Sequence, residues 1–220
     1  MSGPATVAAP GRVWRIGRGS EPLTVRRCEP ADATSPRCGK RFDSSTGDYD
    51  VLYFGTTLEA CFGETLARLR PSIDVIALVR EEWEQRGFMA VGAVPADWRT
   101  RRTAVAVTFG DVEHPDTHTF LRRELALGLS ALGYRDLDVG VLRGSDRRVT
   151  QLVSEWVYRR VDGSGAQRYA GIRYLSRVCS DWECWAVLGD VELVPLELKP
   201  ITLDVPELQR VAKQFELQVF

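Results

Sequence analysis

The sequence predicts an α+β fold in which strands and helices alternate irregularly. Short apolar runs bounded by turn-forming residues recur through the 220 residues, and four stretches show helical periodicity. The helices are too few and too irregularly spaced for a regular βαβ repeat. The length predicts one domain over residues 1–220, with residues 1–10 as a flexible lead-in.

The elements are assigned from run length, periodicity and turn residues. Strands are predicted at residues 50–55, 73–79, 103–109, 138–142, 170–175, 184–188 and 191–198. Helices are predicted at residues 56–70, 116–133, 147–160 and 205–217. Segments rich in Pro, Gly, Asp and Ser predict loops at residues 28–40, 94–102 and 162–168.

Composition excludes several classes of protein. Hydrophobic residues make up 44%, but no apolar run approaches the ~20 residues that span a bilayer. The N-terminus lacks a basic cluster ahead of an apolar core, so we expect a cytoplasmic protein. A net charge of -1 provides no overall field for nucleic acid or membrane binding. The 5 cysteines are irregularly spaced, which favours reduced thiols over a disulfide framework.

Motifs for other chemistries are missing. The chain has no GxGxxG dinucleotide loop, and neither of its 2 histidines lies near a GxSxG nucleophile motif. His114 and His118 are separated by Pro115, and no matching cluster of metal ligands follows them. We therefore predict no metal site.

The segment 56–70 is the most informative. Thr56 and Glu59 have the spacing of a capping box, which predicts a helix start at about Thr57. A mid-helix glycine costs about 1 kcal/mol relative to alanine, so Gly63 indicates close packing or close approach. Glu64 shares its face with small residues and is either a surface glutamate paired with Arg68 or a carboxylate open to a ligand.

Three further candidates are ordinary when taken singly. Arg41 fits a surface loop, Tyr53 fits a core position within a strand, and Ser176 fits a turn after the strand at 170–175. Their functional interpretation depends on the order of motifs along the whole chain.

Five motifs occur in a characteristic order: "VWRIGRG", "GKRFD", "VLYFG", "LEACFGE" and "GIRYLSR". This order resembles the RES domain family over roughly residues 11 to 190. The resemblance implies an ADP-ribosyltransferase-like fold with split, bent β-sheets and flanking helices. It also implies NAD as the substrate, no prosthetic group, and a helix-turn-helix antitoxin of the Xre type as the partner, because family members are typically toxins of toxin-antitoxin pairs.

The resemblance also implies roles for individual residues. Glu64 would stabilise the positive charge that develops on the ribose when nicotinamide leaves, and Ser176 would hold a ribose or carboxamide group. Arg15 and Arg41 would bind the pyrophosphate, and Tyr53 would orient the nicotinamide. Thr150 and Gln151 would line the pocket, without an assigned role. Phe42 and Leu175 stand where the family often has Trp and Pro.

Three functions fit these features. The first is an NAD-degrading toxin that cleaves the nicotinamide N-glycosidic bond, as a glycohydrolase or a phosphorylase. The second is an ADP-ribosyltransferase that modifies a protein, and the third is an inert module that binds a nucleotide or a partner. The sequence leaves open the ADP-ribose acceptor, the identity of the antitoxin and whether the chain forms a homo-oligomer.

Overall fold

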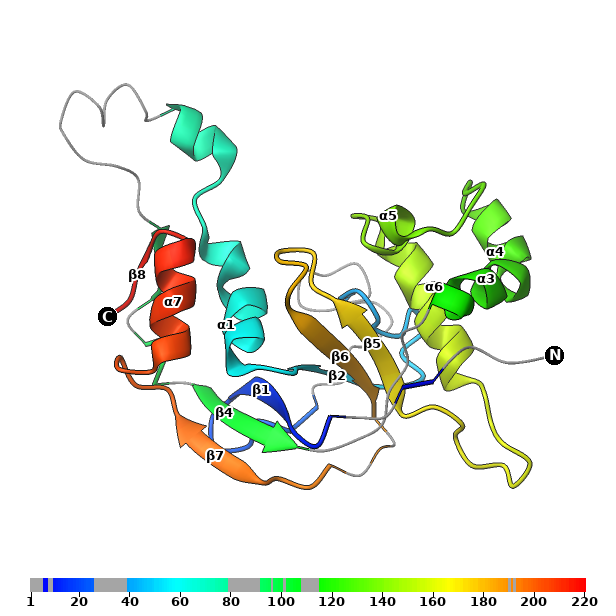
Figure 1. Ribbon diagram of the computed structural model, residues 1–220, viewed down its shortest axis with the longest axis horizontal. Helices are drawn as coiled ribbons and strands as arrows, with labels where there is room; N and C mark the ends of the chain where they lie inside the picture. The colour runs from blue at the N-terminus through cyan, green and yellow to red at the C-terminus, as the bar shows by residue number, and fades with distance from the viewer. Residues whose placement is uncertain are drawn as a thin grey trace.

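The computed structural model describes residues 6–7, 10–25, 39–78, 92–95, 97–100, 102–107, 115–189, 191 and 193–220. It combines helices with a largely antiparallel sheet, which confirms the α+β class (Figure 1). The six strands of this sheet are β1 (Val13–Arg18), β2 (Val51–Gly55), β4 (Arg102–Val107), β5 (Gly171–Leu175), β6 (Glu183–Leu188) and β7 (Glu197–Pro200).

The strand order is β5-β6-β2-β1-β4-β7, and the two halves of this sheet are joined at one point. Within each half the strands pair over four to six residues, whereas β1 and β2 pair only through Trp14 and Gly55. This is a split sheet of the kind that the resemblance implies. A second, parallel pair joins β3 (Gly92–Ala93) to β8 (Leu217–Gln218).

The helices form two groups at opposite ends of the molecule. At one end, α1 (Leu58–Leu66) and its continuation η2 (Ala67–Leu69) pack against α7 (Pro206–Gln214). The other end carries α3 (Pro115–Glu124), α4 (Ala126–Ala131), α5 (Val139–Leu142) and α6 (Arg147–Tyr158). Figure 1 shows β5 and β6 between the two groups.

Alternation along the strands gives the sheet two buried faces. In β2, Leu52 and Phe54 join one apolar cluster, while Val51 and Tyr53 pack against the cluster beneath α3 to α6. Because successive side chains of a strand point to opposite faces, this register places Tyr53 on the face that carries the helices. The candidate site is built on that face.

Two predicted strands are helical. Residues 73–78 form a helix in which Ser72 Oγ accepts a hydrogen bond from the Val75 amide, and Ile73 and Leu78 are 84% and 82% exposed. Residues 139–142 form α5, because Asp138 caps it by accepting from the Val141 amide at 2.7 Å. Apolar content suggested strands, but local capping favours helices at both places.

Two boundaries also differ from the prediction. The cap of α1 is Thr57, whose hydroxyl accepts from the Ala60 amide at 3.1 Å, so the capping box at Thr56 and Glu59 was wrong. Thr56 instead donates to Glu183, which draws its hydroxyl away from the helix. The predicted strand at 191–198 is reduced to β7, because residues 193–196 have no strand partner.

The other described elements follow the prediction. Strands at 50–55, 170–175 and 184–188 are confirmed, as are helices at 56–70, 147–160 and 205–217. The helix at 116–133 breaks at Leu125 into α3 and α4, and β1 was not predicted as a strand. The loop at 28–40 and the lead-in at 1–10 lie largely outside the described residues. No helix in the described part of the chain is long and apolar enough to span a membrane.

Candidate active site

Glu64 lies in the second half of α1, next to Gly63, which packs closely against Trp182. Phe62 and Leu66 are fully buried, whereas Glu64 is exposed on a different face of the helix. A Cβ atom added at Gly63 would lie 1.9 Å from Cζ3 of Trp182. The glycine therefore lets the β6 side of the molecule approach α1 closely, which is the packing reason that the sequence indicated.

The hydroxyl of Ser176 connects the end of β5 to Glu64. Ser176 is 1% exposed, and its Oγ donates a short hydrogen bond to Glu64 Oε1. The same oxygen accepts from the amides of Val178 at 2.9 Å and Cys179 at 3.4 Å, and the Ser176 amide donates to the carbonyl of Trp182. Ser176 is thus both a turn residue and a fixed donor that orients an exposed carboxylate.

Arg41 enters the same region from the loop before β2. Its Nη2 donates to the Leu142 carbonyl at 2.7 Å, and its Nη1 donates to the Leu175 carbonyl at 3.3 Å. The guanidinium also lies over the rings of Phe42 and Tyr174, at 5.2 and 4.9 Å from their centroids. Arg41 therefore lies next to the peptide that leads into Ser176, and bridges it to the end of α5.

Tyr53 fixes the loop that carries Arg41. Its hydroxyl donates to Asp43 Oδ1 at 2.7 Å and accepts from the Phe42 amide at 2.9 Å. Burial raises the pKa of Tyr53 well above its usual value, and the nearby Asp43 carboxylate raises it further. The hydroxyl is therefore a neutral anchor, and any contact with a ligand would use the ring of Tyr53.

Arg15 lies in β1, next to the backbone of Tyr53 in β2, and is half-buried. Its Nε donates to the Pro22 carbonyl at 2.8 Å, and its Nη1 donates to the Tyr53 carbonyl at 3.0 Å. Burial lowers the pKa of Arg15 from its usual value. These contacts with the backbone brace the junction between β1 and β2, and they occupy donors that the resemblance assigned to the pyrophosphate.

Thr150 and Gln151 lie in the first half of α6, away from the contacts that connect Glu64 to Arg41. Thr150 is 1% exposed, and its hydroxyl donates to the Arg147 carbonyl of its own helix at 3.0 Å. Gln151 is half-buried. Among the described residues, no hydrogen bond joins either side chain to Arg41, Glu64 or Ser176. Ser154, one turn later, does connect α6 to the loop by donating to the Phe42 carbonyl at 2.7 Å.

Tyr174 and Cys184 are paired across β5 and β6, with Arg41 over the Tyr174 ring, and were not picked out from the sequence. Burial raises the pKa of both groups, and the charge of Glu64 raises each further, whereas Arg41 acts in the opposite direction. Burial likewise raises the pKa of Cys61 to about 12. These raised pKa values keep Tyr174, Cys184 and Cys61 neutral at pH 7. The available signal for Tyr174 was its place two residues before Ser176 in "GIRYLSR".

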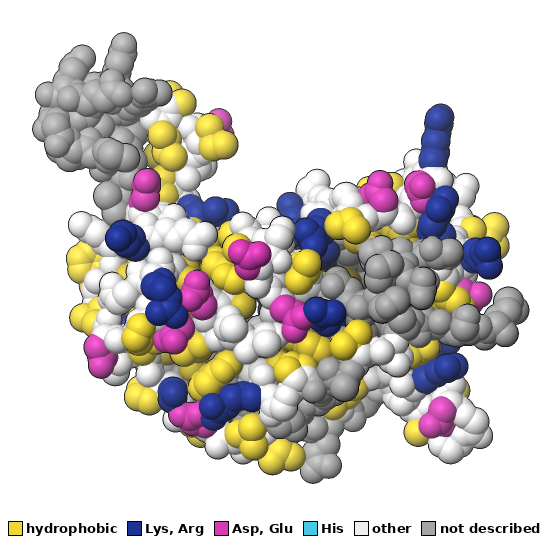
Figure 2. Space-filling view, in the orientation of Figure 1, with side chains coloured by type: hydrophobic (Ala, Val, Ile, Leu, Met, Phe, Trp, Pro, Cys, Tyr) yellow, Lys and Arg dark blue, Asp and Glu magenta, His cyan; other side chains and the backbone are white. Residues whose placement is uncertain are grey.

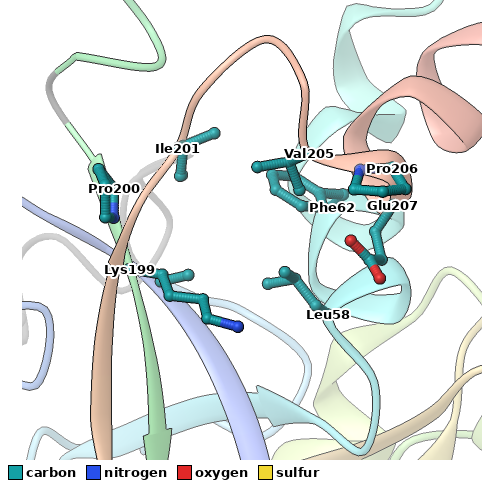
Figure 3. Close-up of a pocket in the computed structure, with 9 residues that line it drawn as sticks. Leu58, Phe62, Lys199, Pro200, Ile201, Val205, Pro206 and Glu207 are labelled. Atoms are coloured by element: carbon teal, nitrogen blue, oxygen red, sulfur yellow. The ribbon is translucent and has the colours of Figure 1, made fainter.

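A cavity of about 130 Å³ lies elsewhere in the fold (Figure 3). Its lining comes from α1, β4, the end of β7, the segment between β7 and α7, and the start of α7, and consists of Leu58, Phe62, Ala104, Lys199, Pro200, Ile201, Val205, Pro206 and Glu207. Sites for drug-sized ligands usually measure about 300–1,000 Å³, so this cavity is too small for a dinucleotide. It contains none of the candidate site residues.

Comparison with known proteins identifies the family. No curated protein matches the sequence significantly. The crystal structure of the M. tuberculosis MbcT-MbcA toxin-antitoxin complex includes a chain with a TM-score of 0.49 and 10% identity, and the match covers 96% of this chain and 91% of that one. The RES domain matches residues 12–206, which include Arg15, Arg41, Tyr53, Glu64 and Ser176. This protein therefore belongs to the RES domain family.

Proposed function

We propose that this RES domain protein degrades NAD by cleaving the bond between nicotinamide and ribose. The observation that supports this most directly is the hydrogen bond from buried Ser176 to exposed Glu64. It holds a carboxylate in a fixed direction at a surface that a substrate can reach. Arg41 supplies a positive charge next to the same turn through its bond to the Leu175 carbonyl.

The chemistry requires an anion beside the ribose. Loss of nicotinamide leaves positive charge on the ribose ring, while the leaving group departs as a neutral molecule and needs little help from an acid. A preorganised carboxylate stabilises that charge without reorganising during the reaction. Glu64 supplies the carboxylate, and Ser176 acts through Glu64 as a positioning residue.

The biological role that follows from the family resemblance is that of a toxin. Consumption of NAD would arrest growth, so the cell needs an inhibitor, and we propose a helix-turn-helix antitoxin of the Xre type that blocks the site. Co-expression with the adjacent gene tests this role. Growth should be arrested when the toxin is expressed alone and restored when the neighbouring gene is expressed with it.

Replacement of Glu64 by glutamine tests the enzymatic proposal. The amide keeps the shape but lacks the negative charge, so the rate of nicotinamide release from NAD should fall on the order of 10²-fold or more. Glu59→Gln is the matched control, because Glu59 lies on the same helix and pairs with Arg210 at 2.8 Å. Equal activity of Glu64→Gln and the wild type would remove Glu64 from the mechanism.

Product analysis separates the possible acceptors. The wild-type protein is incubated with NAD in the presence and absence of inorganic phosphate, and with a cell extract. ADP-ribose indicates hydrolysis, ADP-ribose 1''-phosphate indicates phosphorolysis, and label on protein indicates transfer. If no nicotinamide is released under any of these conditions, the chain is not an NAD-consuming enzyme.

A further inference from the structure

The carboxylate of Glu183 connects the β5–β6 hairpin to the segment that leads into α1. Glu183 begins β6 and pairs with Leu175, the last residue of β5. One oxygen of its carboxylate accepts from the guanidinium of Arg173 in β5, and the other accepts from the Thr56 hydroxyl at 2.7 Å. The carboxylate therefore has one partner on the hairpin and one partner between β2 and α1.

Thr56 is held by three hydrogen bonds. Its hydroxyl donates to Glu183 and accepts from Nε1 of Trp185 at 2.9 Å, while its amide donates to the Glu183 carbonyl at 3.0 Å. Trp185 is 1% exposed, and the side chains of Arg173 and Glu183 are 26% and 24% exposed. Hydrogen bonds to charged groups are among the strongest in proteins, particularly away from water. Arg173, Glu183, Thr56 and Trp185 thus form one polar network.

The polar network lies where the sheet divides. Gly55, just before Thr56, pairs with Trp14 of β1 and with Cys184 of β6, and the chain then leaves the sheet for α1. Because a single pair of residues joins β1 to β2, strand pairing contributes few bonds at this point. The polar network adds side-chain bonds between α1 and the β5–β6 hairpin there.

The two segments that the polar network joins carry the two partners of the Ser176–Glu64 hydrogen bond. Arg173 lies three residues before Ser176, and Thr56 precedes the helix that contains Glu64. Figure 2 shows a hollow along the upper edge of the molecule, where Figure 1 places α1 and the turn between β5 and β6. A shift of α1 relative to that turn would separate the Ser176 hydroxyl from the Glu64 carboxylate.

Arg173 lies on the face of β5 that is turned away from Arg41. Successive side chains of a strand point to opposite faces, and the next residue, Tyr174, has its ring beneath the Arg41 guanidinium. Arg173 instead pairs across the sheet with Trp185, which belongs to the apolar cluster of the other face. An effect of Arg173 on the reaction must therefore act through the positions of other groups.

We propose that the polar network positions Glu64 against Ser176, with Thr56 and Arg173 acting through Glu183. The consequence for catalysis rests on the proposed function, in which Glu64 is the carboxylate that stabilises the ribose cation. Misplacement of a reacting group by about 1 Å can cost on the order of 10²-fold in rate. Because the network residues act on position, their loss should lower kcat more than it changes KM for NAD.

Replacement of Thr56 by valine tests the polar network, because valine has nearly the shape of threonine but can neither donate to Glu183 nor accept from Trp185. Thr56→Val should lower kcat for nicotinamide release about tenfold and change KM for NAD less than about twofold. Thr56→Ser keeps the hydroxyl and should retain most of kcat. Thr103→Val is the control, since the Thr103 hydroxyl donates to a backbone carbonyl in β4's half of the sheet.

Two further variants test whether the network acts through the proposed bond. Arg173→Met should lower kcat about tenfold, as Thr56→Val does, whereas Arg173→Lys keeps a charged donor for Glu183 and should retain more activity. Thr56→Val combined with Ser176→Ala should lose little more than either single variant, because both changes act on the same bond. Independent effects would instead multiply to about a hundredfold loss, and that result would overturn the proposal.

Crystal structures of the wild type and of Thr56→Val give a readout that needs no turnover. The Ser176–Glu64 hydrogen bond should be present in the wild type and longer than about 3.5 Å in Thr56→Val. If the wild type releases no nicotinamide, the enzymatic proposal fails, and these two structures still decide the positioning role. A bond that persists in Thr56→Val contradicts that role. A lowered unfolding temperature with unchanged kcat would show that the network serves only the fold.

Discussion

At the scale of single residues, the candidate site depends on which groups are charged and which are fixed. Ser176 is buried and donates to Glu64, while Tyr53 is anchored to Asp43 and to the backbone of Phe42. Buried hydrogen bonds of this kind hold side chains in one geometry, because breaking them leaves an unsatisfied polar group. The neutral side chains of Ser176 and Tyr53 therefore fix the positions of Glu64 and of the loop that carries Arg41.

Ser176→Ala should reduce kcat for nicotinamide release about tenfold, since it removes a hydrogen bond to a charged group that contributes about 1.5–3 kcal/mol. KM for NAD should change less, because the serine acts on the orientation of Glu64. Steady-state kinetics with NAD measure both constants.

Ser180→Ala is the matched control, since Ser180 is exposed and accepts from Arg143 at 3.3 Å. A variant at Ser176 with unchanged kcat and a lowered unfolding temperature would show that this serine serves only the turn.

At the scale of secondary structure, α1 is placed by contacts at both ends. Thr57 caps it, and Thr56 just before it donates to Glu183 at 2.7 Å and accepts from Trp185 Nε1 at 2.9 Å. Further along the helix, Gly63 receives the ring of Trp182. These contacts tie the helix that carries Glu64 to the strands that carry Ser176.

Gly63→Ala should destabilise the protein by about 1–2 kcal/mol, since overpacking of a tight contact costs about 1–3 kcal/mol and outweighs the helix propensity that alanine gains. The added methyl group would displace Trp182, which is 6% exposed. Urea denaturation followed by circular dichroism measures the change.

Gly163→Ala is the control, because a Cβ atom there would meet nothing within 4 Å. Should Gly63→Ala prove as stable as the wild type, the approach of Trp182 is not what requires glycine at this position.

At the scale of the whole molecule, two apolar clusters support the site from either side. One lies between the helices α3 to α6 and the sheet, and contains Tyr174 and Cys184. The other joins α1 and α7, and contains Phe62, Trp182 and Leu208. Most of α7 lies beyond residue 206, where the match to the family ends, yet it covers the buried face of α1.

Leu208→Ala should lower the free energy of unfolding by about 2–5 kcal/mol, the usual cost of removing a fully buried leucine side chain. Leu208 is 0% exposed, whereas Leu203, the control position, is 44% exposed. Denaturant titration of both variants provides the comparison, and equal loss at the two positions would mean that α7 does not support the fold.

Much of this architecture could be predicted from the sequence, and the misses have identifiable physical causes. Periodicity located α1, α6 and α7, because each buries an apolar stripe. The runs at 73–79 and 138–142 were wrongly predicted as strands, because apolar composition does not distinguish a strand from a short capped helix. The contact of Ser176 with Glu64, 112 residues away, has no signature in the local sequence.

The sequence by itself determined the fold class, the helix that carries Glu64 and, through the order of its motifs, the resemblance to the RES family. Local propensity and periodicity carry that information. Only the tertiary structure decided that Ser176 donates to Glu64, that Arg15 binds backbone carbonyls and that Lys40 lies over the ring of Tyr53. These relations join distant segments, and they exist only once the strands have paired and the helices have packed.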